Sequence, residues 1–378
     1  MEFGWTPEQR ADYDRSLEAA RSAAPRDSGA AAYYTREQWL RIGGAGLLGA
    51  SVPAEYGGLG RGALDTALIY EAFGKGCSRT GLVFASAAHL FACAMPLAEF
   101  GADAVRKELL PGMCEGRLIA ANAMTEPEAG SDISKLATTA VKVPGGYLLN
   151  GLKNFVTNGP VADLCVTYAT TDAAAGHLGA TGFVVDADTP GFVAGEPFAK
   201  MGMHDCPAGT IEFRDCFVPD ERVLGAPGLG GVIFQHSMGW ERACLFALYL
   251  GLQERLIEEA VAHVRTRRQF GRRIGEFQSV ADRIVDMKLR LESGRLLLYR
   301  ACWEMDRGDR AVLPVALSKL QVSEAAVASA LDAIQLFGGR GYLSETGIES
   351  ALRDAVPATV FSGSSEVQRR LIAGELGL

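Results

Sequence analysis

The chain has 378 residues, of which 48% are hydrophobic and 22% are charged, and its formal net charge at pH 7 is −8. This length suggests roughly two to three domains, and the composition is that of a soluble globular protein. The acidic balance argues against a nucleic-acid partner or an anionic membrane surface. The eight cysteines include no Cys-x-x-Cys pair and no zinc-type Cys/His spacing, so we expect reduced thiols and no metal site.

The N-terminus shows no basic segment followed by an apolar one, so we expect no secretory signal and a cytoplasmic location. The most apolar window covers residues 82–100. It contains His89, Pro96 and Glu99, and it therefore predicts a buried core helix rather than a membrane span.

Helix signals dominate the first third of the chain. Thr6-Pro7-Glu8-Gln9 combines an N-cap threonine, a proline at the first helical position and a capping-box glutamine, and residues 35–38 repeat the capping signal. A glycine-rich loop over 51–60 ends the second helix. Periodicity predicts further helices over 64–73, 82–100 and 103–114. These features indicate an all-helical domain over residues 1–120.

The pattern changes to short runs rich in Val, Ile, Thr, Phe and Tyr, separated by turn residues. They predict strands over 117–124, 137–143, 146–149, 163–170, 181–185, 192–195 and 210–218. Short strands at this spacing are typical of an antiparallel barrel or sandwich, here over residues 121–225.

From about Met238 the helical period returns and holds to the end, with breaks at 307–309 and 338–341. Long helices with short connections indicate a helical bundle over residues 226–378. The glycine-rich segment 225–231 lacks the Lys-Ser/Thr of a nucleotide loop, so we expect a flexible connection there. The overall fold class is α+β, with helical, β and helical domains in that order and no Rossmann fold.

One loop stands out at the helix-to-strand change, residues 123–132, Ala-Met-Thr-Glu-Pro-Glu-Ala-Gly-Ser-Asp. Its small residues leave backbone amides free to close around an anion such as a pyrophosphate. The same composition is also ordinary turn chemistry, and spacing alone does not decide between the two. The decapeptide resembles the Thr-Glu-Pro-x-Ala-Gly-Ser-Asp signature of the acyl-CoA dehydrogenase family.

The resemblance extends through several separate motifs beyond about residue 35. It implies a central antiparallel β-barrel, a C-terminal four-helix bundle and an FAD cofactor. Residues 153–159 match a segment in which an aromatic ring, here Phe155, covers the isoalloxazine and Thr157 bonds near N5. The family more often has Trp at the Phe155 position, and Phe keeps the aromatic face.

Two further motifs imply that the flavin site needs a second subunit. Residues 267–271 and 277–278 match an element whose arginine, here Arg267, reaches the FAD pyrophosphate held by a neighbouring subunit. Residues 335–339 match a second contact across subunits, so a homodimer or homotetramer is implied. The FAD-contacting residues implied by the resemblance are Met124, Thr125, Gly130, Ser131, Phe155, Val156, Thr157, Arg267, Gln269, Phe270, Gln278, Gln335, Phe337, Gly338, Gly339, Ser364 and Glu366.

The catalytic base is not at its usual place. Most family members have a glutamate in an aromatic-Glu-Gly-Thr stretch near the C-terminus, and Ser362 occupies that position here. The isovaleryl- and long-chain-type members carry the base just before an arginine at the start of the first C-terminal helix, where this chain has Glu241-Arg242. Glu241 is therefore the candidate base.

The residues around Glu241 support that role. On a helix, Cys244, Leu245 and Leu248 fall on the same face as Glu241, so we expect an apolar, buried setting that raises its pKa toward about 6–7. A first-turn glutamate favoured by the helix dipole remains an alternative.

The resemblance also implies how the thioester is held. The backbone N–H of Ser362 would bond the thioester oxygen, and Ser131, Arg242 and Gly363 would contact the substrate. Relatives often have Asp three residues before the arginine, where this chain has Gly239. The substrate is therefore either an acyl-CoA or an acyl-carrier-protein thioester.

The leading hypothesis is an FAD-dependent α,β-dehydrogenase of acyl thioesters, which removes an α-proton and transfers a β-hydride to flavin N5. The resemblance implies an electron-transfer flavoprotein as acceptor. The loss of the usual base at Ser362 motivates an alternative, a flavin-dependent oxygenase or oxidase on the same scaffold. A binding protein that keeps flavin without redox chemistry is a third hypothesis.

Overall fold

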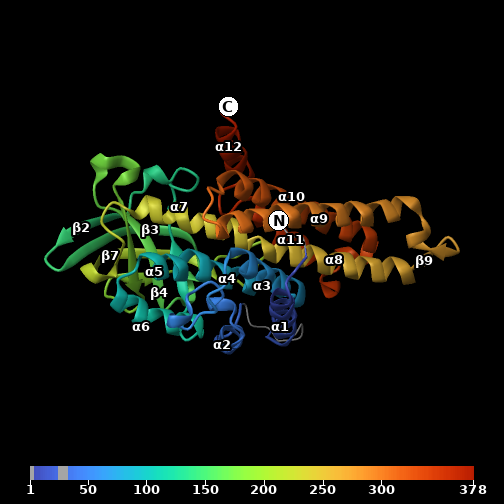
Figure 1. The fold of residues 1–378 in the computed structure, drawn as a ribbon, viewed down its shortest axis with the longest axis horizontal. Coiled ribbons are helices and arrows are strands. Elements are labelled where there is room, and N and C mark those ends of the chain that lie inside the picture. The colour runs from blue at the N-terminus through green and yellow to red at the C-terminus, as the bar shows by residue number, and fades with distance from the viewer. Residues whose placement is uncertain (1–3, 24–32) are drawn as a thin grey trace.

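The structure is a computed structural model that describes residues 4–23 and 33–378. Figure 1 shows an elongated molecule with the β-sheet at one end and the β9 hairpin at the other, joined by long helices. Helix α12 projects from the middle of this arrangement (Figure 1).

In the described residues of the N-terminal part there are six α-helices, and a π-helical turn, η3 (Leu90–Ala94), links two of them. The α-helices are α1 (Pro7–Ala23), α2 (Arg36–Gly44), α3 (Ala63–Gly76), α4 (Thr80–His89), α5 (Met95–Phe100) and α6 (Asp103–Cys114). The predicted capping boxes at Thr6 and Thr35 are confirmed, because each threonine and the glutamine three residues later bond reciprocally. The window Thr80–Phe100 is apolar enough to cross a membrane, but it is 94% buried inside the protein, as predicted for a core helix.

The central part is a β-sheet in the order β6-β7-β3-β1-β4-β5-β8, with β2 bridging β3 and β4. Its strands are β1 (Ala120–Ala123), β2 (Thr139–Val143), β3 (Gly146–Thr157), β4 (Leu164–Thr170), β5 (Ala180–Asp186), β6 (Phe192–Ala194), β7 (Ala208–Pro219) and β8 (Val223–Leu224). Strands β3, β1, β4 and β2 close into a four-stranded circuit. The expected barrel is not wholly antiparallel, since β4 runs parallel to both β1 and β2.

Strand β3 is longer than the sequence predicted. The predicted strand ends at Leu149, but β3 continues to Thr157. Gly151 has φ +153°, and a Cβ there would lie 2.4 Å from Thr138 Oγ1. The glycine therefore makes a register irregularity within the strand rather than a turn between strands.

The first helix of the C-terminal part, α7, begins at Gly230, which is before the predicted return of the helical period near Met238 and inside the segment expected to be a flexible connection. Its elements are α7 (Gly230–Trp240), the π-helical turn η8 (Glu241–Leu245), α8 (Ala247–Thr266), β9 (Arg268–Gln269), β10 (Arg272–Arg273), α9 (Gln278–Asp306), α10 (Val312–Phe337), α11 (Ile348–Ala355) and α12 (Ser365–Glu375). Helices α8, α9 and α10 pack on one another, and α12 packs on α10. The predicted breaks at 307–309 and 338–341 are confirmed.

Short 3-10 turns complete the chain: η1 (Leu47–Gly49), η2 (Ala54–Tyr56), η4 (Ile133–Lys135), η5 (Gly159–Val161), η6 (Ala173–Leu178), η7 (Asp220–Arg222), η9 (Ile274–Glu276), η10 (Gly338–Tyr342), η11 (Ser344–Thr346) and η12 (Val356–Thr359). All eight cysteines are buried and free of disulfides.

Two glycines bring the N- and C-terminal helices into close contact. A Cβ on Gly74 of α3 would lie 2.1 Å from Leu248 O, and a Cβ on Gly251 of α8 would lie 2.1 Å from Glu71 O. Only glycine permits this approach of α3 and α8. The contact seats the start of α8, and the π-turn before it, against the N-terminal helices.

Candidate active site

Glu241 and Ser362, both singled out in the sequence, meet in the structure. Glu241 is the first residue of the π-turn η8 and is 7% exposed. Its Oε1 accepts a hydrogen bond from Ser362 Oγ, 121 residues further along the chain. π-Helical turns occur frequently at functional sites, and this one presents the carboxylate to the segment that leads into α12.

That segment is a sharp corner held by two side chains. Ser362 has φ +54° and Gly363 has φ +86°, both in the left-handed region. Arg242 Nε donates to the Ser362 carbonyl at 2.8 Å, and Gln368 Nε2 donates to the Gly363 carbonyl at 2.9 Å. Arg242, expected at the substrate, is thus engaged with the protein backbone through Nε.

Aromatic packing holds the corner from the other side. The Phe361 ring lies 4.5 Å from the ring of Phe84, 5.5 Å from Phe246 and 6.4 Å from Tyr249, measured between centroids. These rings come from α4, from the residue after η8 and from α8. Sequence reasoning did not assign them, because nothing local marks residues so far apart as neighbours.

Burial raises the pKa of Glu241, against the opposing effects of the Ser362 hydrogen bond and the charges of Arg242 and Lys319. Lys319 on α10 is completely buried, and its Nζ lies 5.3 Å from the Phe246 ring centroid. Burial, followed by the charge of Arg242, lowers the pKa of Lys319 to about 8. A carboxylate whose pKa is raised is a stronger base than one in water, and it is therefore better suited to take up a proton.

The signature loop is anchored to β3. The Thr125 carbonyl accepts from Asn154 N at 2.8 Å, and Glu126 and Ala129 exchange two backbone hydrogen bonds. Glu126 points into the interior and its carboxylate accepts from Ala137 N at 2.6 Å. The loop is therefore fixed beside Phe155, while Gly130 and Ser131 are exposed.

Phe155 presents an open aromatic face. It has φ +54°, sits at a register irregularity of β3, and is 69% exposed. A bulge re-aims a side chain, and here it turns the ring out of the sheet. Val156 is fully buried in the sheet core, so its side chain packs inside the domain, whereas Thr157 is half-buried at the end of the strand.

A second group of the expected FAD residues lies at the far end of the molecule. Arg267, Gln269 and Phe270 belong to the β9–β10 hairpin, which Figure 1 shows opposite the β-sheet. The Phe337 ring stacks on His263 at 4.2 Å, so the C-terminal end of α10 lies beside this hairpin. Gln278, Gln335, Gly338 and Gly339 are exposed at the same end. The fold thus separates the expected FAD residues into two groups.

The chemistry of the two groups fits a flavin dinucleotide. Phe155 offers a free face for a planar ring, and the hairpin offers guanidinium groups for phosphates. Within the described ranges, no carboxylate forms an ion pair with the arginines of this end, Arg265, Arg267, Arg268, Arg272, Arg273 and Arg340. Ser364 caps α12 and Glu366 is exposed in its first turn, near the corner that holds Ser362.

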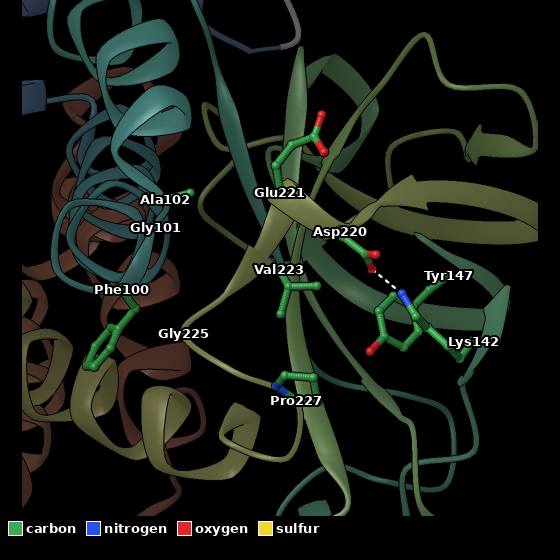
Figure 2. A pocket seen from close by; sticks show the side chains of 10 residues that line it. All are labelled: Phe100, Gly101, Ala102, Lys142, Tyr147, Asp220, Glu221, Val223, Gly225 and Pro227. Carbon is green, nitrogen blue, oxygen red and sulfur yellow. Dashed lines mark hydrogen bonds and ion pairs between the residues drawn. The ribbon is translucent and has the colours of Figure 1, made fainter. Parts of the chain in front are cut away.

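A pocket of about 550 Å³ lies elsewhere, between the end of α5 and the β-domain (Figure 2). Its lining residues are Phe100, Gly101, Ala102, Lys142, Tyr147, Asp220, Glu221, Val223, Gly225 and Pro227. Lys142 already pairs with Asp220 and lies over the Tyr147 ring, as Figure 2 shows. The pocket contains none of the expected site residues. In residues 4–23 and 33–378, no group of three or more His, Cys, Asp or Glu side chains is arranged to hold a metal.

Comparison with known proteins places this arrangement in a family. The N-terminal domain of acyl-CoA dehydrogenases matches residues 10–117, the middle domain matches 121–216, and the C-terminal domain matches 228–377. An L-prolyl-(peptidyl-carrier protein) dehydrogenase of Pseudomonas fluorescens is 54% identical over 347 residues, which is 92% of this chain and 91% of that protein.

Two solved structures are similar over the whole chain. "PigA with FAD and proline" is 43% identical with a TM-score of 0.97, and the match covers 100% of both chains. The prolyl acyl carrier protein oxidase AnaB is 40% identical with a TM-score of 0.95, and the match covers 99% of this chain and 100% of that one. The three domain matches follow one another along nearly the whole chain, and the chain belongs to the acyl-CoA dehydrogenase family.

Proposed function

We propose that this enzyme carries out the FAD-dependent α,β-dehydrogenation of a prolyl thioester held by a carrier protein, with Glu241 as the base. The observation that carries the proposal is the buried Glu241 carboxylate, whose pKa is raised by burial, beside the corner at Ser362. The names of the similar proteins supply the prolyl group and the carrier protein.

The chain's own residues supply proton removal and orientation. Glu241 takes the α-proton, and the backbone N–H of Ser362 donates to the thioester oxygen, which increases the acidity of the α-carbon. Ser131 and Gly363 contact the arm that carries the acyl group. FAD, when bound, supplies the acceptor of the β-hydride.

A carrier-protein thioester is favoured over an acyl-CoA by residue 239 as well. Relatives often place an aspartate there, near the pantetheine arm, whereas Gly239 has no side chain and no heavy atom lies within 4 Å of where its Cβ would be. The position is therefore open, which suits a substrate whose handle differs from that of CoA.

FAD binding is proposed to require two subunits. Met124, Thr125, Gly130, Ser131, Phe155, Val156 and Thr157 line the flavin end, with Ser364 and Glu366 nearby, and Arg267, Gln269, Phe270, Gln278, Gln335, Phe337, Gly338 and Gly339 come from the partner. The distance between the two groups along one chain supports this reading (Figure 1).

An exposed apolar face supports a homodimer or homotetramer. Val285, Leu289 and Leu296 of α9 and Leu331 of α10 are each more than half exposed, and the α9 residues lie on one helical face. A soluble monomer rarely leaves such a face uncovered. The finer domain limits, 1–120, 121–225 and 226–378, the four-helix bundle and the cytoplasmic location belong to the same proposal.

The electron acceptor is proposed to be an electron-transfer flavoprotein. The alternative, a flavin-dependent oxidase or oxygenase, is favoured by the name of the AnaB structure. Turnover with different electron acceptors distinguishes the two activities. An oxidase turns over with dioxygen alone, whereas a dehydrogenase stops with reduced flavin until an electron-transfer flavoprotein is added.

The test is anaerobic titration of the holoenzyme with L-prolyl-loaded carrier protein and with a panel of acyl-CoA esters. The prolyl thioester should bleach the flavin and the acyl-CoA esters should not. Glu241→Gln should slow bleaching by at least about 100-fold, the scale on which general bases act. Glu37→Gln, at an exposed carboxylate of α2, is the matched control and should behave as wild type. Bleaching of Glu241→Gln at the wild-type rate would refute the mechanism.

A further inference from the structure

We propose that the Ser362 side chain is a positioning residue of this site: its hydroxyl holds one oxygen of Glu241 and leaves the other for the proton of the substrate. This inference rests on the proposed function, in which Glu241 is the base. Most family members have a glutamate at position 362, and the backbone N–H is the group expected to act there in this chain. A role for the serine hydroxyl is therefore additional.

The hydrogen-bond pattern separates the two carboxylate oxygens. Ser362 Oγ donates to Oε1 of Glu241. Within residues 4–23 and 33–378, no hydrogen bond engages Oε2. A carboxylate tied at one oxygen cannot rotate freely about its last torsion, so the free oxygen keeps one direction.

The backbone that carries the hydroxyl is held before any substrate arrives. The Ser362 carbonyl accepts from Arg242 Nε at 2.8 Å and from Gln368 Nε2 at 3.3 Å. The neighbouring Phe361 is packed among three rings. Ser362 also keeps φ +54°, a conformation that a non-glycine residue adopts only when its surroundings impose it. The surrounding contacts therefore offset the conformational free energy that this backbone costs, and they hold Ser362 as a preorganised donor.

The same hydroxyl serves both protonation states of the base. It donates to the carboxylate before the reaction, and it can accept from the carboxylic acid that forms when the α-proton arrives. Ser362 takes no proton from the substrate. The proton passes from the α-carbon to Glu241, and the electron pair of the broken C–H bond stays with the substrate as the β-hydride leaves.

Other groups near Glu241 do not duplicate this contact. The titratable groups facing it are Arg242 on η8, Lys319 on α10, Cys93 on η3 and Tyr168 on β4. Burial raises the pKa of the Cys93 thiol and of the Tyr168 phenol, so both are neutral at physiological pH. Arg242 and Lys319 act through their charge. Replacing Ser362 leaves all four in place and removes only the hydrogen bond.

The experiment compares Ser362→Ala and Ser362→Gly with wild type, using flavin reduction by L-prolyl-loaded carrier protein followed in a stopped-flow instrument across acidic and neutral pH. In both variants the rate of flavin reduction should fall by a factor of about ten or more, which is the effect expected from losing a hydrogen bond to a charged group. On the plot of flavin-reduction rate against pH, the acid limb of both variants should shift to higher pH, because the lost hydrogen bond from Ser362 stabilised the Glu241 carboxylate. The substrate concentration at half-saturation and the FAD content should be unchanged. Ser22→Ala, at an exposed serine of α1, is the control.

Two results would overturn the proposal. If Ser362→Ala is slow but Ser362→Gly is normal, the effect comes from backbone strain and not from the hydroxyl. If both variants keep the wild-type acid limb, the hydroxyl does not act on the base. Glu241→Gln separates this failure from that of the proposed function: an inactive Glu241→Gln beside normal Ser362 variants refutes only the positioning role.

Discussion

Lys153 Nζ lies 2.7 Å from Oε1 of Glu126, and these side chains are 0% and 3% exposed. Lys153 also donates to the carbonyls of Met124 at 3.3 Å and Tyr168 at 2.6 Å. Burial would raise the pKa of Glu126, but the Lys153 charge and several hydrogen bonds outweigh it and lower that pKa. The pair therefore fastens the signature loop, residues 123–132, to β3 and β4. The role of Glu126 is thus to hold the loop through buried contacts.

Lys153→Met should destabilise the protein by about 3–5 kcal/mol, because it leaves a buried carboxylate without its cation. It should also lower the ratio of bound flavin to protein, since the loop next to Phe155 loses its anchor. Chemical unfolding and the visible absorbance of the purified protein measure the two effects. Lys142→Met, which breaks an exposed pair with Asp220, is the control and should cost less than about 1 kcal/mol. Equal losses from both variants would contradict this account.

His89 should make the protein sensitive to mild acid. It is fully buried, its Nδ1 accepts from Ala120 N at 3.0 Å, and burial lowers its pKa to about 4. Because the folded pKa is below the unfolded value of about 6.5, the unfolded state binds more protons between these values. The contribution of neutral His89 to the free energy of unfolding should be fully present above about pH 6.5. The free energy of unfolding should then fall by up to about 3 kcal/mol as the pH drops toward 4.

The measurement is urea unfolding at a series of pH values, for wild type and for His89→Gln. Glutamine does not titrate, so the variant should lose stability at neutral pH but show a flatter pH dependence in this window. A variant with the same slope as wild type would assign the acid sensitivity to other groups.

Lys319→Met should stabilise the protein. The Lys319 pKa of about 8 lies below the usual value of 10.5, so below pH 8 the fold carries the cost of a buried ammonium, about 3 kcal/mol at most. Methionine has a similar length and no charge. The gain in stability of Lys319→Met over wild type should shrink as the pH rises from 8 toward 10.5, because folded wild type releases the Lys319 proton in this range while the unfolded chain still holds it. A lower melting temperature for Lys319→Met at pH 7 would show that the ammonium has a partner that stabilises it.

Arg267→Gln should weaken FAD binding roughly 10- to 100-fold, as expected when a guanidinium loses a charged acceptor. Arg300→Gln, which removes an exposed pair with Glu304, is the control. Equilibrium dialysis of each apoprotein with FAD gives the dissociation constants of the two variants.

Hybrid assemblies test whether the site is shared. Co-assembly of Arg267→Gln chains with Phe155→Ala chains should restore tight FAD binding in one site of each mixed dimer, because both lesions then fall in the other site. If each chain bound FAD by itself, every site in the hybrid would carry a lesion and no tight binding would return.

The local features of this chain could be predicted from its sequence. The capping boxes at Thr6 and Thr35 and the helix over 103–114 depend on neighbouring residues, so the structure reproduces them. The apolar face expected around Glu241 is also local, and the carboxylate is buried as expected. Strand β3 shows the limit of local prediction, because its irregularity at Gly151 depends on the close approach of Thr138, which neighbouring residues do not reveal.

The contacts that make the site depend on the tertiary structure. The family motifs in the sequence indicated Glu241 and Ser362 as separate candidates, but they could not place these side chains against each other across 121 residues. They likewise could not pair Lys153 with Glu126, or assemble the rings around Phe361. Helical period and caps are set within a few residues, whereas these contacts arise only when α3 and α8 pack and the chain after α11 folds back on η8. Local chemistry therefore determined the elements, the resemblance to the family indicated the candidate residues, and long-range packing decided which of them touch.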